Sequence, residues 1–205
     1  MITDAFRTTP EWILGDASQR SYAKTLADAG RIVLPVYDFE NNTPESKAPL
    51  LLIKGGILVV PDLLVMGAKP TCWNEVKAKS VPTWRRCPPG PRWEHGIDFA
   101  LSTEYAKVEE ASGYVVFIVI HELTSPLSAN QEGPLSGPPC LLYIALQTAI
   151  EMGDRRKDWP GGAAQPNRRG RNREGGLLWD RSAMKPMRSL EPPQPKQPEL
   201  LEAIA

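Results

Sequence analysis

The chain has 205 residues with 24 basic and 24 acidic side chains, and a net charge of zero excludes a globally basic surface for a polyanionic partner. This length is typical of one domain with additions, because single cores rarely exceed about 250 residues. Three cysteines at unrelated spacings and the lack of an apolar run long enough for a membrane span predict a reduced, cytoplasmic protein without a membrane partner.

A helix and an edge strand are the first predicted elements. Residues 17–29 have helical spacing of apolar side chains, Asp16 can cap the helix, Gln19 completes a capping box and Gly30 can end it. Residues 31–37 (RIVLPVY) predict a strand, in which the proline favours an edge or bulge position.

Two strand-like segments follow, separated by a Gly-Ala-Lys-Pro turn. They are residues 57–65 (ILVVPDLLV) and 71–79 (TCWNEVKAK), and we expect them to pair as an antiparallel hairpin. An ionised Asp62 within a run of valine and leucine costs several kcal/mol unless something compensates it.

The next segment, residues 80–98, lacks periodicity and predicts a loop. Residues 103–112 predict a helix, and the continuously apolar residues 114–121 (YVVFIVIH) predict a central strand covered on both faces. Residues 140–152 are compatible with a short strand leading into a helix or with helix throughout. The order of helix, three strands, helix and strand predicts an α/β fold, in which helices flank a small mixed sheet.

We expect four segments along the chain. Residues 1–152 form the main domain, and residues 153–175 form a Gly/Arg-rich loop with seven basic and three acidic side chains. Residues 176–185 allow an additional strand, and residues 186–205 form a proline-rich tail that stays extended.

Three charged residues in the predicted hairpin form a candidate site. Glu75 and Lys77 are two residues apart on a strand, so they share one face while Val76 points to the other. If Asp62 faces the same way, two carboxylates and an ammonium converge, and such oxygen ligands suit Mg²⁺. The alternative is that Asp62 begins a turn after Pro61, while Glu75 and Lys77 pair on a solvated face.

The string VVPDLLV, followed by EVK with Glu75 thirteen positions after Asp62, resembles the PD-(D/E)xK nuclease superfamily. The resemblance covers residues 15–121. It implies a three-layer restriction-endonuclease-like core in αβββαβ order, similar to Holliday-junction resolvases or to uncharacterised phage and bacterial nucleases. It also implies that Asp62, Glu75 and the backbone carbonyl of Val76 bind Mg²⁺, with Mn²⁺ as a substitute, and that Lys77 positions the attacking water. DNA is then the expected partner, and a homodimer is compatible with this function.

One departure from the superfamily pattern concerns the first helix. Resolvase-like members place a glutamate four residues after a glycine, where this chain has Gln19 after Gly15. An amide is a poorer metal ligand, and Asp16, the other candidate contributor, is better explained as a helix cap. The alternatives are therefore a catalytically degenerate nucleic-acid-binding or assembly protein on the same fold, or a nuclease specific for branched DNA or RNA.

Basic and aromatic residues surround the predicted hairpin end. We expect nucleic-acid contacts from Lys79, Trp84, Arg85, Arg86, Arg92 and Trp93, which combine phosphate-binding and base-stacking groups. A hydrophobic plug with solvated arginines is the alternative interpretation. His95 is interpreted as an incidental loop residue, with assistance of proton transfer near the site as the alternative. His121 is interpreted as a core residue with a hydrogen-bond partner.

Overall fold

The computed structural model describes residues 10–36, 50–54, 56–67, 70–79, 82–85, 90–122, 141–156 and 175–187. Its helices are α2 (Pro10–Asp28), α3 (Phe99–Ser112), α4 (Leu146–Met152) and the short 3-10 helix η1 (Arg181–Ala183). Its first strands are β1 (Ile32–Pro35), β2 (Leu50–Ile53), β3 (Gly56–Val59), β4 (Leu63–Met66), β5 (Cys72–Lys79) and β6 (Thr83–Arg85). The later strands are β7 (Arg92–Asp98), β8 (Val115–Glu122), β9 (Leu141–Ala145), β10 (Asp154–Arg156), β11 (Gly176–Asp180) and β12 (Lys185–Pro186).

A six-stranded mixed sheet in the order β1-β4-β5-β8-β9-β12 forms the centre of the fold. β5 pairs antiparallel with β4 and parallel with β8, as expected for a mixed sheet. β8 holds the continuously apolar run of the sequence, because a strand with neighbours on both edges and elements on both faces has buried or half-buried side chains along its length. β1 lies at the edge of the sheet, where the missing N–H of Pro35 breaks no ladder.

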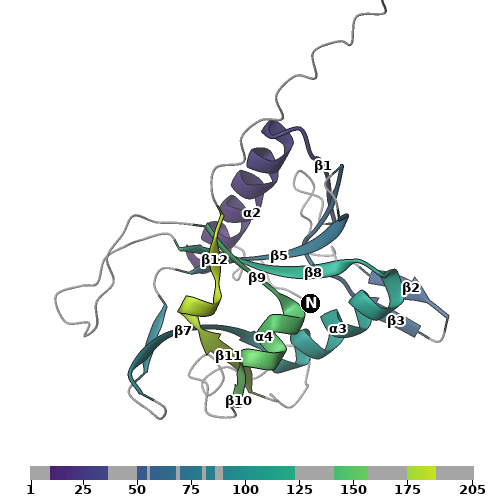
Figure 1. Ribbon diagram of the computed structural model, residues 1–205. Coiled ribbons are helices and arrows are strands. Elements are labelled where there is room, and N and C mark those ends of the chain that lie inside the picture. Colours follow the sequence, from purple (N-terminus) through teal and green to yellow (C-terminus); the bar gives the residue numbers. More distant parts are fainter. Residues whose placement is uncertain are drawn as a thin grey trace, which may run out of the picture.

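Helices cover both faces of this sheet (Figure 1). On one face, Tyr22 and Leu26 of α2 pack against Val76 of β5. On the other face, α3 and α4 join the main core cluster, together with apolar side chains of a second, four-stranded sheet in the order β10-β11-β7-β6. The expected order is present in α2, β1, β4, β5, α3 and β8, and the predicted α/β class with flanking helices is confirmed.

The predicted strand 57–65 is wrong in one respect, because it is divided in two. β3 pairs with β2 in a separate hairpin, in which Leu58 faces Leu51, whereas β4 pairs with β5 through Leu63 and Asn74. Pro61 lacks an N–H for a sheet ladder, which is consistent with the break between the two strands. Asp62 therefore lies in the break, next to the start of β4.

Three further predictions need correction. α2 begins at Pro10, so Asp16 is inside the helix and pairs with Arg20 at 2.8 Å instead of capping it. The predicted loop 80–98 contains β6 and β7, which pair with each other. At the start of the predicted basic loop, Asp154–Arg156 forms β10, while residues 157–174 lie outside the described part of the chain.

The last three segments of the chain, residues 140–152, 176–185 and 186–205, also had predicted structures. In residues 140–152, a strand (β9) leads into a helix (α4), which is the first of the two interpretations. β11 pairs with β7, and β12 extends the main sheet beside β9. Of the proline-rich tail, residues 188–205 lie outside the description. Within the described residues, no helix has the length and apolar character to cross a membrane.

Candidate metal centre

Asp62 is held in place by backbone groups of two neighbouring segments. The Val76 N–H donates a hydrogen bond to Asp62 Oδ2 at 2.8 Å, and the Asp62 carbonyl accepts one from the Val36 N–H at 2.9 Å. Only 5% of the residue is exposed. The side chain is therefore fixed beside β5 instead of pointing into solvent. Of the alternative interpretation, the pairing of Glu75 with Lys77 is present, but Glu75 is buried and does not lie on a solvated face.

Glu75 and Lys77 share one face of β5, because side chains alternate along a strand. The intervening Val76 packs into the cluster beneath α2 on the opposite face. Glu75 is 2% exposed, and its Oε1 forms an ion pair with Lys77 Nζ, while the Lys77 side chain is 34% exposed. The ammonium thus reaches from the buried glutamate toward solvent.

The two carboxyl groups affect each other strongly. Burial and the nearby charge of Glu75 raise the pKa of Asp62 to about 8, although Lys77 and the Val76 N–H act in the opposite direction. A proton on Asp62 makes a hydrogen bond to Glu75. Lys77 supplies one positive charge to the two buried carboxyl groups, so a second is needed to balance both, and the choices are a proton or a cation.

The second oxygen of the Glu75 carboxylate, Oε2, indicates that the site fits a cation. This atom is buried and has no hydrogen-bond partner among the described residues. An unpartnered buried carboxylate oxygen is costly, and it is the kind of ligand that Mg²⁺ prefers. The residues present therefore fit a small divalent cation with two carboxylate ligands, completed by water and substrate oxygens.

The described residues contain no group of three or more histidine, cysteine, aspartate or glutamate side chains that could hold a metal. The backbone carbonyl of Val76 stays the predicted third ligand. Mg²⁺ is often bound by only one or two carboxylates, so the two acids are sufficient for this class of site.

The structure places the expected contributors from the first helix on the other side of the sheet. The buried side of α2 includes Ser18, Tyr22 and Leu26, which pack on the face of β5 opposite to Glu75. Gln19 is next to Ser18, whose hydroxyl lies 3.1 Å from His121 Nδ1, so His121 has the partner expected for a core histidine. Metal binding by Gln19 or Asp16 stays a prediction.

The expected nucleic-acid residues have different environments. Trp93 is 8% exposed, so it lies in the core and is not placed to stack on a base. Arg92 binds Glu94 and Asp154 at 2.8 and 2.9 Å, and these acids neutralise its charge. Neither environment favours a nucleic-acid contact, and both contacts stay predictions. Lys79 lies on the face of β5 that carries Glu75. The side chains of Trp84 and Arg85, and all of Arg86, lie outside the described structure.

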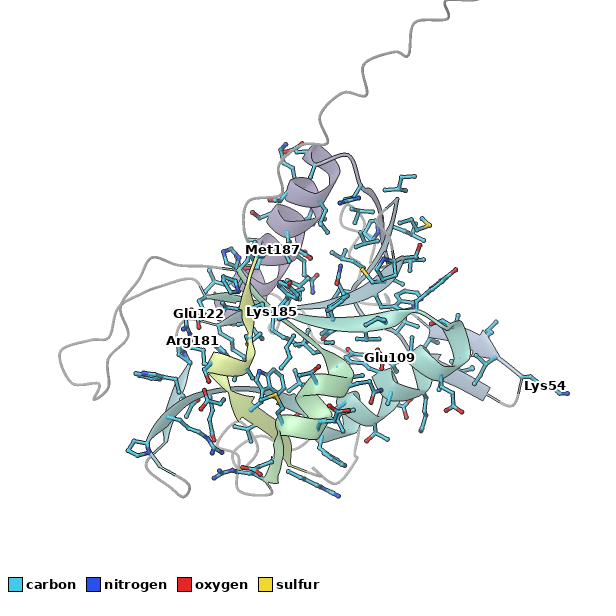
Figure 2. The ribbon with its side chains drawn as sticks, viewed as in Figure 1. Lys54, Glu109, Glu122, Arg181, Lys185 and Met187 are labelled. Carbon is cyan, nitrogen blue, oxygen red and sulfur yellow. The ribbon has the colours of Figure 1, made fainter. Side chains whose placement is uncertain are left out.

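A second charged group was missed by the sequence interpretation. His95 is a buried residue of β7, and its Nε2 lies 2.7 Å from Glu122 Oε1 at the end of β8. Arg181 of η1 donates two hydrogen bonds to the same carboxylate, both at 2.7 Å (Figure 2). An acid at the end of a buried apolar strand was the signal in the sequence, but the partners are distant along the chain.

Comparisons with known proteins find similarity among solved structures. No protein-family model matches the chain, and no curated protein matches it. Among solved structures, the chain is similar to Hjc of Archaeoglobus fulgidus, described as a Holliday junction resolvase from an archaeal hyperthermophile. The TM-score is 0.46 and the identity 10%, over 82% of this chain and 90% of the other. The element order and strand pairing of the chain itself confirm the fold class that the sequence resemblance implied.

Proposed function

We propose that this chain is a Mg²⁺-dependent nuclease that hydrolyses phosphodiester bonds in DNA. The observation that carries the proposal is the buried pair of carboxyl groups on Asp62 and Glu75, with Lys77 beside Glu75 and one glutamate oxygen without a partner. A pair that needs one added positive charge is unfavourable for stability alone, and it is suited to holding a cation.

In this proposal, each of the three side chains has a separate role. Asp62 and Glu75 would hold Mg²⁺, which when bound lowers the pKa of a water molecule and polarises a phosphate. Asp62 must lose its proton for this, while its hydrogen bond from Val76 keeps the carboxylate oriented. Lys77, partly exposed next to Glu75, would orient the attacking water and stabilise the negative charge that develops on the phosphate.

The decisive experiment is cleavage of a supercoiled plasmid in the presence of Mg²⁺ or Mn²⁺. Lys77→Ala should reduce the cleavage rate by about 10²- to 10³-fold, the usual loss when one group that stabilises developing charge is removed. Lys24→Ala is the matched control, because Lys24 is exposed on α2 and pairs with Asp28 one turn further along the same helix. An unchanged cleavage rate in Lys77→Ala would contradict the proposed catalytic role of Lys77.

A non-catalytic nucleic-acid-binding or assembly protein on the same fold is the second candidate. It is favoured by the placement of Gln19 on the α2 side of the sheet and by the presence of only two acids at the centre in the described residues. DNA binding that weakens with salt, without metal-dependent cleavage and without a rise in melting temperature on addition of Mn²⁺, would support it. Branched DNA and RNA should be included among the substrates.

A further inference from the structure

Lys79 is a second lysine on the face of β5 that carries the acid pair. It follows Lys77 by two residues, so its Cα lies about 7 Å further along the strand. Its side chain is partly buried, and burial together with the charge of Lys77 lowers its pKa, while Asp98 acts in the opposite direction. Lys77 and Lys79 therefore place two positive charges in a row along β5, leading away from Asp62 and Glu75.

Glu122 lies next to Lys79, since the two residues are partners in the parallel pairing of β5 and β8. Its carboxylate connects three elements: β8, β7 through His95, and η1 through Arg181. Burial raises the pKa of Glu122, but the hydrogen bonds from Arg181 and His95 outweigh this effect and lower it to about 2. The carboxylate is thus ionised and doubly held by Arg181 at neutral pH (Figure 2).

This arrangement also determines the state of His95. Burial lowers the pKa of His95, the charges of Lys79 and Arg181 lower it further, and the bond with Glu122 acts against them. A neutral ring next to an ionised carboxylate carries its proton on Nε2 and donates it to Glu122. His95 therefore adds no positive charge that would repel Lys79.

We infer that Lys79 binds a backbone phosphate adjacent to the scissile one, and that Glu122, His95 and Arg181 form a positioning cluster that holds the end of β5 for this contact. The substrate in this inference rests on the proposed nuclease function. A nucleic-acid strand carries one charge per about 3.4 Å of helix axis, so a cation about 7 Å beyond Lys77 is within reach of a phosphate one or two steps from the scissile one.

The test compares a direct contact, its positioning cluster and a structural control. The variants are Lys79→Gln, Glu122→Gln and Glu109→Gln. Glu109 is the matched control because it braces the other end of β8, accepting hydrogen bonds from the Val116 N–H at 2.7 Å and from Gln147 Nε2 at 2.6 Å. Binding to a fluorescent DNA duplex is measured without metal over a range of salt concentrations, and cleavage is measured with Mg²⁺.

Lys79→Gln should reduce the slope of log affinity against log salt concentration by about 1, the effect of losing one phosphate contact. Its KM should rise several-fold while kcat stays within about two-fold, because the contact is away from the reacting phosphate. Glu122→Gln should show the same changes in salt slope and KM. The double variant Lys79→Gln/Glu122→Gln should lose no more DNA affinity than either single variant. Glu109→Gln should lower the melting temperature but leave the salt slope unchanged.

Arg181→Lys provides a second variant should Glu122→Gln not fold, because it keeps the charge but loses the paired hydrogen bonds. An unchanged salt slope in Lys79→Gln would overturn the phosphate contact. If Glu122→Gln or Arg181→Lys alters only the melting temperature, the cluster is a structural brace and the positioning role is wrong. Binding with these salt effects but without cleavage would refute the proposed catalysis and leave this inference standing.

Discussion

Asp62 combines burial with a neighbouring carboxylate, and both effects favour its protonated form. Its folded-state pKa of about 8 lies above the value of 3.8 expected for the free side chain. Between these two pH values the folded chain keeps a proton that the unfolded chain releases, so the free energy of unfolding falls as the pH rises. The acid pair therefore destabilises the metal-free protein at neutral and alkaline pH.

Asp62→Asn should stabilise the metal-free protein, and the gain should be larger at pH 8 than at pH 5. An asparagine can accept the Val76 N–H and donate to Glu75, as protonated Asp62 does, without a titrating proton. Thermal unfolding should show a rise of a few degrees at pH 8, equivalent to about 1 kcal/mol for a chain of this size. Mn²⁺ should raise the melting temperature of the wild type but not of the variant. A variant that is less stable than the wild type at pH 8 without metal would contradict this account.

At the level of elements, β8 was predicted as a strand from the sequence, whereas β7 was predicted as part of a loop. Their sequences explain the difference. β8 is apolar from Val115 to Ile120, and this run requires neighbours on both sides wherever the strand is placed. β7 (RWEHGID) has buried Glu94 and His95, whose charges and polarity hide the pattern of a strand. Arg92 and Arg156 near Glu94, and Glu122 beside His95, make that burial possible, and all but Arg92 lie on other elements.

Replacing isoleucine by alanine should destabilise the protein much more in β8 than in β1. Ile118→Ala in β8 should lower the free energy of unfolding by about 2 to 4 kcal/mol, because Ile118 is 0% exposed and its loss leaves a cavity. Ile32→Ala in the edge strand β1 should change it by less than about 0.5 kcal/mol, because Ile32 is 62% exposed. Urea unfolding of both variants checks this difference. Equal losses would mean that β1 is covered in solution.

In the whole molecule, Glu122 ties the second sheet and η1 to the main sheet through His95 and Arg181. Its pKa is depressed to about 2 in the folded state, from 4.5 for the free side chain. The stability that it contributes is fully present above pH 4.5 and is lost as the pH falls toward 2.

Glu122→Gln should therefore be less stable than the wild type at pH 6, and the difference should shrink as the pH falls from about 5 to 2. The measurement is the urea midpoint of both proteins at several pH values. Glu109→Gln serves again as a control, because it removes a different carboxylate at the opposite end of β8. A difference that stays constant down to pH 2 would show that the carboxylate's charge is not what joins the sheets.

The sequence by itself determined the features that depend on near neighbours: the apolar central strand, the alternation of Glu75, Val76 and Lys77, and the order of the core elements α2, β1, β4, β5, α3 and β8. Only the tertiary structure decided that Asp62 lies in a break between β3 and β4, that Trp93 is buried, and that Glu122 meets His95 and Arg181, 27 and 59 residues away. The physical reason is that burial, and with it the cost of a charge and the pKa of Asp62, depends on contacts between segments distant along the chain.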